Sequence, residues 1–211
     1  MKTGAEAVAL PHTRSRANDF VALAKPRLNL LVVASSVVGY VMGGGEMSDA
    51  ARVLFTIAGT ALVAGGASAF NQVIEREPDS LMVRTRQRPV PGGRLEVPES
   101  LLFAAVTSLA GLTVLGVGVN LLSAAIAFTT LATYALIYTP LKRRSSFATV
   151  VGAVPGALPP MIGWAAASGS LSPGAWILFG ILFLWQLPHF LAIAWMYRED
   201  YARAGFPMLP V

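Results

Sequence analysis

The sequence of 211 residues contains no cysteine and only two histidines, His12 and His189. Without cysteine the chain can form neither disulfides nor thiolate metal sites, and a zinc site would have to rely on carboxylates, which is not expected. Charge is also scarce, because Asp, Glu, Lys and Arg make up 13% of the residues, against about 25% in an average soluble domain. Hydrophobic residues account for 55%. This composition indicates an integral membrane protein.

Six apolar segments are long enough, or nearly so, to cross a lipid bilayer as helices. They cover residues 28–42, 53–70, 99–119, 121–138, 147–167 and 176–197. The first is short for a span unless residues 20–24 are embedded as well. The fifth contains Pro155, Pro159 and Pro160, so we expect it to break where protein groups or a cavity can satisfy the freed carbonyls. The sequence therefore predicts an all-α bundle of about six transmembrane helices.

The bundle is predicted to occupy residues 20–211, after a polar tail of residues 1–19 that lacks the apolar core of a signal peptide. The second segment is rich in small residues, which let neighbouring helices approach closely. These residues are Gly59, Gly65, Gly66, Ala67 and Ser68.

The formal net charge of +5 could suggest a nucleic-acid partner, but the basic residues are distributed as in the loops of a membrane protein. Fifteen of the sixteen lie in the N-terminal region or in the loops after the second, fourth and sixth segments, and only Arg52 lies on the other side. By the positive-inside rule, the N-terminus and these three loops are cytoplasmic. No nucleic-acid partner is expected.

Residues 71–89, NQVIEREPDSLMVRTRQRP, follow the second segment directly. Asn71, Glu75 and Asp79 are spaced four apart, so a helix continuing past the segment would align their oxygens on one face. Pro78 would bend or end that helix. Hard oxygen ligands in this arrangement suit Mg²⁺. A solvated cytoplasmic loop with mixed charges is the other interpretation, and the spacing alone favours a site only modestly.

Basic residues follow these acids, at Arg84, Arg86 and Arg88, and guanidinium groups bind phosphate through paired hydrogen bonds. Two more charged stretches, at 138–144 and 198–201, follow the fourth and sixth segments. All three stretches are predicted at the cytoplasmic face. They therefore indicate a metal and phosphate site that soluble diphosphates reach from the cytoplasm.

The chain resembles the protoheme IX farnesyltransferase (haem O synthase) family of UbiA-type intramembrane prenyltransferases. The resemblance rests on N-x-x-x-[DE]-x-x-x-D-x-x-M-x-R-T-x-x-R-P at 71–89, YTPLKRR at 138–144, and LFLWQ-x-PHF followed by EDYARAG-x-PMLP near the C-terminus. It covers nearly the whole chain from Lys25 onward, and the three motifs agree with the family in their order and spacing. It implies transfer of the farnesyl group of farnesyl diphosphate to the vinyl group of haem B, which gives haem O.

The resemblance also implies roles for particular residues. Mg²⁺ would be held against the diphosphate by the two acid motifs, which could share one ion or hold two. The implied metal-site residues are Asn71, Glu75 and Asp79 of the first motif and Glu199 and Asp200 of the second. The implied phosphate-binding bases are Arg84, Arg88, Lys142 and Arg143. The expected location is a bacterial-type inner membrane, with the N-terminus and the site loops cytoplasmic.

Two features depart from the family pattern. Glu75 stands where the family commonly has Asp. The Glu75 side chain is longer, and it can still bind Mg²⁺ after its rotamer or backbone adjusts. Family members have about nine spans, whereas this sequence has six and stops at Val211. We therefore expect it to be a C-terminally incomplete part of a nine-helix fold.

The implied chemistry needs an apolar cavity, expected between the second, fourth, fifth and sixth spans, to hold the isoprenoid and exclude water. Two alternatives stay open. One is a UbiA-type transferase with an aromatic acceptor such as a quinone precursor. The other is a non-catalytic transporter, because transporters also use broken helices; charged residues at one face rather than at the midplane argue against it.

His189 and Tyr138 each have two interpretations. His189 follows Pro188 and could bind haem through its iron or a propionate, or it could donate to a carbonyl freed by the proline, and the two are equally favoured. Tyr138 could support the phosphate site or anchor the helix at the membrane interface, and we favour the site.

Overall fold

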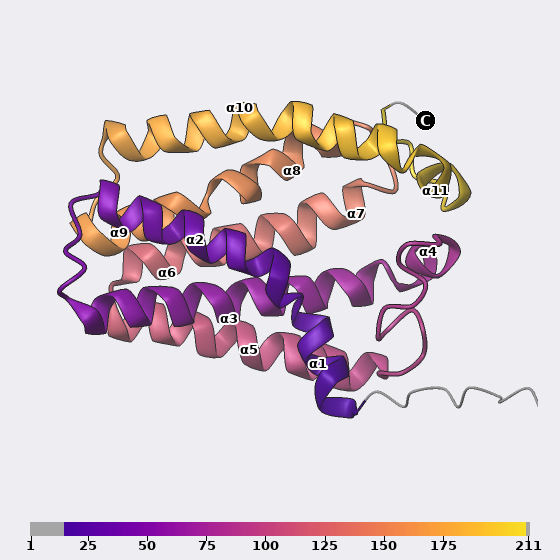
Figure 1. The fold of residues 1–211 in the computed structure, drawn as a ribbon, viewed down its shortest axis with the longest axis horizontal. Helices are drawn as coiled ribbons and strands as arrows, with labels where there is room; N and C mark the ends of the chain where they lie inside the picture. The colour runs from indigo at the N-terminus through magenta and orange to yellow at the C-terminus, as the bar shows by residue number, and fades with distance from the viewer. Residues whose placement is uncertain (1–14, 210–211) are drawn as a thin grey trace, which may run out of the picture.

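The computed structural model describes residues 15–209, and every regular element within them is a helix. Five helical segments are long and apolar enough to cross a membrane, and a bent pair formed by α1 and α2 brings the number to six. They lie side by side as one bundle (Figure 1). The predicted all-α bundle of about six spans is confirmed. The elements are α1 (Arg16–Ala24), α2 (Pro26–Met42), α3 (Ala50–Ile74), α4 (Arg76–Leu81), α5 (Val97–Gly118), α6 (Leu121–Ala132), the π-helix η1 (Thr133–Tyr138), α7 (Thr139–Leu141), α8 (Ala148–Ala157), α9 (Pro159–Ser168), α10 (Pro173–Met196) and α11 (Arg198–Arg203).

The first span bends by 41° between α1 and α2. Lys25 lies at the bend with φ of 50°, a left-handed conformation that residues other than glycine rarely adopt. Its N–H closes α1 on the Ala22 carbonyl, and Pro26 then begins α2, where proline is well tolerated. The short first segment is thus extended by α1, which begins at Arg16, inside the range predicted as tail; residues 1–14 of that tail lie outside the described residues.

Small residues bring the spans into close contact, as predicted from the glycine, alanine and serine residues of the second segment. A Cβ atom at Gly66 would lie 2.8 Å from the carbonyl oxygen of Ala104, so α3 and α5 pack almost backbone to backbone. On the other side of the bundle, a Cβ atom at Gly163 of α9 would lie 1.7 Å from the Ser36 carbonyl oxygen of α2. Larger residues at either position would force the helices apart. This packing fixes the end of α3, where the first motif begins.

The first motif does not continue α3 as one helix, which corrects the predicted single face. α3 ends at Ile74, Glu75 occupies the junction, and α4 follows at once. The cause is Pro78, because proline removes the N–H that would bond to the Ile74 carbonyl, and its ring clashes with that carbonyl. The break therefore falls one turn before the proline. Asn71, Glu75 and Asp79 nevertheless lie within one turn of the break, and all three are buried.

The fourth and fifth spans are irregular. The fourth passes from α6 into η1, and such π segments are rare and often accompany functional sites. The fifth breaks at Leu158, before Pro159 and Pro160, which confirms the predicted break. Its most apolar stretch is 67% buried, more than that of any other candidate span. The interrupted backbone is thus surrounded largely by protein, as a broken span requires.

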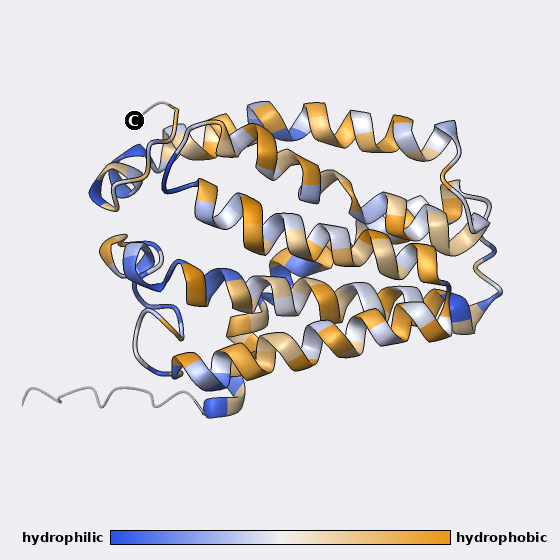
Figure 2. Cartoon of the chain, turned by 180° about the vertical axis from the view of Figure 1, so that it is seen from behind, coloured by the Kyte–Doolittle hydropathy of each residue, from blue (hydrophilic) through white to orange (hydrophobic). Residues whose placement is uncertain are grey.

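Polar residues collect at the ends of the bundle, and apolar residues cover its length (Figure 2). The short helices α4 and α11 lie at the same end as α1 and α7 (Figure 1). The three charged stretches therefore meet at one end, as the distribution of basic residues predicted.

Candidate active site

A buried ion pair occupies the break between α3 and α4. Glu75 is 3% exposed, and its Oε1 lies 2.5 Å from Nζ of Lys142, which follows α7. Oε1 is shielded from water, and the Lys142 ammonium is the group that it contacts. Each charge thus compensates the other, as ionised groups in a protein interior require.

Lys142 carries a positive charge at physiological pH. Burial alone would lower the pKa of its ammonium, but the Glu75 carboxylate and the nearby Tyr138 and Tyr134 raise it, and the pKa ends above the ordinary value for lysine. The ammonium also lies 4.8 Å from the centre of the Tyr138 ring, a cation–π contact. A fixed, buried cation of this kind is suited to binding an anion.

A second buried carboxylate lies on α4. Asp79 is 1% exposed, and its Oδ2 accepts a hydrogen bond of 2.7 Å from Nη1 of Arg88. The loop between the two residues is held by Thr85, whose hydroxyl donates to the Asp79 carbonyl at 2.8 Å. The Arg88 side chain is 28% exposed. Its guanidinium therefore joins the buried acid to the outer surface of the site.

Asn71 connects three parts of the bundle. Its Oδ1 accepts a hydrogen bond of 3.2 Å from Nζ of Lys25 at the α1–α2 bend. Its Nδ2 lies 3.4 Å from the Thr139 hydroxyl, which donates in turn to the Tyr134 carbonyl in η1 at 2.8 Å. These contacts hold the amide in one orientation. Asn71 is therefore positioned by residues from the first and fourth spans.

Lys25 is a site residue that the motif interpretation did not include. The charged groups that act on its ammonium are Arg88, Glu75, Lys142 and Asp79. Three basic side chains, those of Lys25, Arg88 and Lys142, thus share the site with two carboxylates, and their donors suit an anionic ligand. The available signal was a lysine beside a proline at the mouth of an apolar segment, because ionisable residues in such places are often functional.

The second acid motif is not joined to the first by its carboxylates. Asp200 accepts hydrogen bonds from the backbone N–H groups of Val83 and Arg84, at 3.1 and 3.3 Å, and from the side chain of Arg203 at 2.8 Å. Glu199 is exposed. Within residues 15–209, no three Asp, Glu or His side chains gather closely enough to hold a metal ion by themselves. The two motifs therefore meet through the backbone of the loop after α4.

Arg84, a predicted phosphate base, also contacts the C-terminal segment. Its guanidinium carbon lies 4.2 Å from the centre of the Tyr197 ring and 5.7 Å from that of Tyr201. Its Nη2 also donates to the Tyr201 hydroxyl at 3.4 Å. Arg84 and Arg88 are therefore held by different partners, although only four residues separate them.

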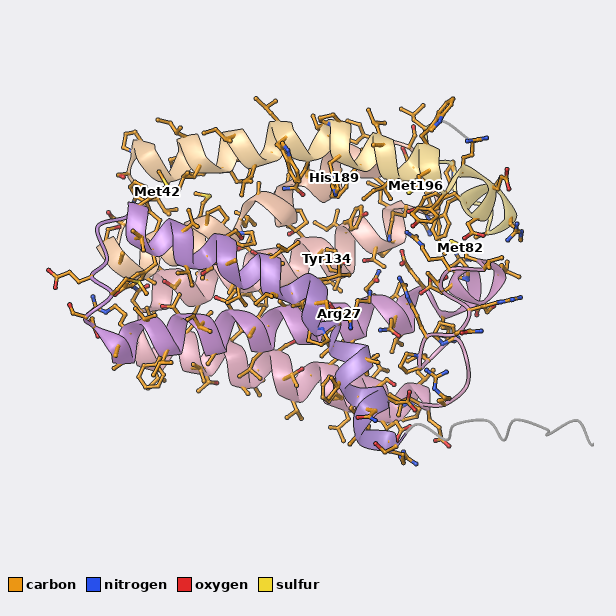
Figure 3. All side chains as sticks on the ribbon, in the orientation of Figure 1. Arg27, Met42, Met82, Tyr134, His189 and Met196 are labelled. Atoms are coloured by element: carbon orange, nitrogen blue, oxygen red, sulfur yellow. The ribbon has the colours of Figure 1, made fainter. Side chains whose placement is uncertain are left out.

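Two predicted residues lie apart from the buried charges. Arg143 is exposed and lines a surface hollow with Ile74 and Arg144. His189 is exposed on α10 (Figure 3), and its ring stacks on Trp185 with 4.9 Å between ring centres. Among the hydrogen bonds of residues 15–209, none joins His189 to a carbonyl. Its contact with haem stays a prediction.

A cavity of about 280 Å³ borders the charged cluster and is mostly apolar. It lies between the spans predicted to enclose it, with α2 as an additional wall. Lys25 and Tyr138 belong to both the cavity and the cluster, so the two are continuous, and Gly152 makes room because a Cβ atom there would lie 2.4 Å from the Tyr138 ring. The lining residues are Lys25, Leu28, Asn29, Val32, Ala64, Ala67, Ser68, Thr130, Tyr134, Tyr138, Gly152, Pro155, Gly156, Pro159 and Phe190.

The donor set of the first motif fits Mg²⁺. Glu75, Asp79 and Asn71 offer hard oxygens, and all three residues are buried. Mg²⁺ commonly takes one or two carboxylates and leaves its other positions to water and phosphate, so three clustered acids are not required. Because each carboxylate is now paired with a base, a phosphate group could take over those bases. The arrangement is suited to an anion accompanied by a divalent cation.

A model of the UbiA prenyltransferase family matches residues 32–211. A protoheme IX farnesyltransferase of Solibacter usitatus (strain Ellin6076) is 52% identical over 202 residues, which cover 92% of this chain and 69% of the relative. Another, of Anaeromyxobacter sp. (strain Fw109-5), is 45% identical over 207 residues, which cover 98% of this chain and 70% of the relative. The matched part of the chain thus corresponds to 69% and 70% of the length of these two proteins.

Solved structures share the fold. A structure from a study of digeranylgeranylglyceryl phosphate synthase in membranes gives a TM-score of 0.76 at 17% identity, covering 92% of this chain and 68% of that one. A UbiA homologue from Archaeoglobus fulgidus, bound to GPP and Mg²⁺, gives a TM-score of 0.71 at 17% identity. The match covers 89% of this chain and 66% of that one. At this identity the likeness concerns the fold alone.

Proposed function

The chain belongs to the UbiA prenyltransferase family, and from this premise we propose that it transfers the farnesyl group of farnesyl diphosphate to the vinyl group of haem B, giving haem O and diphosphate. Support comes from relatives that carry the name protoheme IX farnesyltransferase at 52% and 45% identity. Further support comes from the charged motifs, which meet at one end of the bundle.

The observation that carries this proposal is the continuity between an apolar cavity and a cluster of paired charges. A prenyl diphosphate has the same division, with an anionic head and an apolar chain. Lys25, Arg88 and Lys142 would bind the head, and the cavity would hold the chain. A site for a soluble anion would not need the apolar walls, and a simple lipid groove would not need two buried carboxylates.

The reaction begins when the bond between the allylic carbon and the diphosphate oxygen breaks and its electron pair leaves with the diphosphate. Lys142 and Arg88 are charged and lie beside Glu75 and Asp79, and they can stabilise the departing charge when they contact the phosphate oxygens. The apolar cavity keeps water from the farnesyl cation. The cation then takes the π electrons of the vinyl group, water adds to the carbon left positive, and the proton that water loses passes to the solvent.

Mg²⁺ is the cofactor that we propose for this site, held by Glu75 and Asp79 with Asn71 beside them. When bound, it supplies a Lewis acid that neutralises charge on the diphosphate. With both carboxylates on the metal, Lys142 and Arg88 would be free to bind the phosphate oxygens. Glu199 and Asp200 stay predicted ligands from the opposite loop.

The proposal is tested by incubating purified protein in lipid nanodiscs with haem B, farnesyl diphosphate and Mg²⁺, and analysing the haem by chromatography and mass spectrometry. We expect haem O and one diphosphate for each turnover, and no product in EDTA. A prenylated quinone precursor in a parallel reaction without haem would favour the aromatic acceptor instead. Movement of substrate across a liposome membrane without turnover would favour a transporter.

We also propose that the site end of this integral membrane protein faces the cytoplasm. The chain has no cysteine, so single cysteines introduced at Ser80, Ser145 and Ser48 report without background. We expect an impermeant maleimide to label intact cells at Ser48 only, and to label Ser80 and Ser145 after the membrane is opened. The reverse pattern would contradict the assignment from positive charge.

A further inference from the structure

Asp200 binds two consecutive backbone amides of the loop that connects α4 to Arg88. Its Oδ1 accepts from the N–H of Val83 at 3.1 Å, and its Oδ2 accepts from the N–H of Arg84 at 3.3 Å. Arg203 donates to Oδ1 from the same helix at 2.8 Å, and the Asp200 side chain is only 12% exposed. A carboxylate that accepts from charged and backbone donors forms strong hydrogen bonds. Both of its oxygens are therefore occupied.

Apolar contacts strengthen the same attachment. Met82, which precedes the two amides, is 2% exposed and packs in a cluster with Ala194, Phe206 and Met208. Figure 3 places Met82 at the end of the bundle that also carries Met196. The Arg84 side chain lies against the rings of Tyr197 and Tyr201, as described above. One short loop is thus held by the C-terminal segment through its backbone, through Met82 and through Arg84.

We propose that Asp200 is a positioning residue, which fixes the loop of residues 82–88 against the segment of residues 194–208 before any metal binds. Because Arg88 belongs to this loop and pairs with Asp79, the attachment sets the geometry of a base that contacts the first acid motif. The consequence for diphosphate binding rests on the proposed function. The attachment itself does not, because it consists of contacts within the chain.

The experiment measures the separation of two spin labels in EDTA, where a residue acting only as a metal ligand can have no effect. Cysteines replace Leu81 on α4 and Ala202 on α11, both of which are exposed, and carry nitroxide labels in nanodisc-embedded protein. We expect Asp200→Ala to lengthen the separation by more than about 2 Å and to broaden its distribution, as for a released loop. The control Glu77→Ala removes an exposed carboxylate of α4 and should leave the separation unchanged.

Asp200→Asn keeps one acceptor oxygen at nearly the same size, so it should give an intermediate separation, and it serves if Asp200→Ala does not fold. An unchanged separation in a folded variant overturns the proposal.

The effect on diphosphate binding is measured as the KM for farnesyl diphosphate in the same variants at saturating Mg²⁺. We expect Asp200→Ala to raise the KM for farnesyl diphosphate roughly tenfold, the loss expected when a hydrogen bond to a charged group no longer holds a binding residue. Saturating Mg²⁺ compensates for the loss of any metal contact that Asp200 makes, so the KM reports the position of the loop. An unchanged KM, or a KM that recovers at high Mg²⁺, overturns the positioning role. Absence of turnover in the parent protein would instead count against the proposed function, and the label separation would still decide the attachment.

Discussion

Asp79→Asn is expected to abolish prenyl transfer, with kcat/KM falling by at least about a thousandfold, because it removes a carboxylate from the proposed metal site and leaves transition-state charge on the diphosphate uncompensated. The structural reason is that Asp79 is 1% exposed and fixes Arg88 at 2.7 Å. One substitution therefore removes a proposed metal donor and weakens the hold on Arg88, a proposed phosphate base. The measurement is the initial rate of haem O formation at several Mg²⁺ and farnesyl diphosphate concentrations.

The matched control is Glu77→Gln, two residues earlier on the same short helix. The Glu77 side chain is 68% exposed and pairs only with its neighbour Arg76, so this change should leave kcat/KM within about twofold, as for most surface substitutions. Asparagine keeps the size of aspartate, and circular dichroism with a thermal melt would show that the variant is folded. If folded Asp79→Asn keeps kcat/KM within about threefold of the parent, the assignment of Asp79 to a transition-state contact is wrong.

Much of the fold could be predicted from composition and spacing. The length of the apolar segments and the one-sided distribution of Lys and Arg predict six spans with three charged stretches at one end, because both features follow directly from the bilayer. The close packing of α3 on α5 follows from Gly66 and its small neighbours. The prolines of the fifth span predicted the break found at Leu158.

The detailed shape of the site could not be predicted in the same way. Spacing of four residues predicted one helical face for Asn71, Glu75 and Asp79, but the clash of Pro78 with a carbonyl one turn earlier moved the break to Glu75. A sequence shows where proline lies, yet the backbone can yield at the proline or a turn before it.

Long-range contacts could not be predicted from the motifs, for a different reason. Lys25 reaches Asn71, which is 46 residues away, only because the chain bends at a left-handed residue before Pro26. The resemblance predicted Asp200 of the second motif as a metal ligand. That prediction concerns its chemistry and says nothing of its contacts within the chain. Its contacts with the amides of Val83 and Arg84 depend on how α10 and α11 pack, which no local pattern encodes.

The buried pair of Lys142 and Glu75 leads to the second large effect. Lys142→Met should lower the free energy of unfolding by about 3–5 kcal/mol, because it leaves the Glu75 carboxylate buried without a counter-charge. It should also stop prenyl transfer, since the substituted side chain cannot bind the diphosphate. The measurements are reversible denaturation in mixed micelles and haem O formation, each compared with Arg144→Met, which removes an exposed basic side chain two residues away.

The double variant Glu75→Gln/Lys142→Met separates stability from catalysis. Replacing both members of a buried ion pair with neutral side chains of similar size is often neutral for stability, so the double variant should regain most of the lost free energy while remaining inactive. The pKa of Lys142 is raised by its surroundings. A group with a raised pKa in the folded state contributes stability below its unfolded pKa, about 10.4 for lysine, and loses it only as the pH rises through the folded value. The deficit of Lys142→Met should therefore be the same at pH values on either side of neutrality. A double variant as unstable as Lys142→Met would show that the cost lies in packing rather than in the unpaired charge, and an active one would remove both residues from the proposed site.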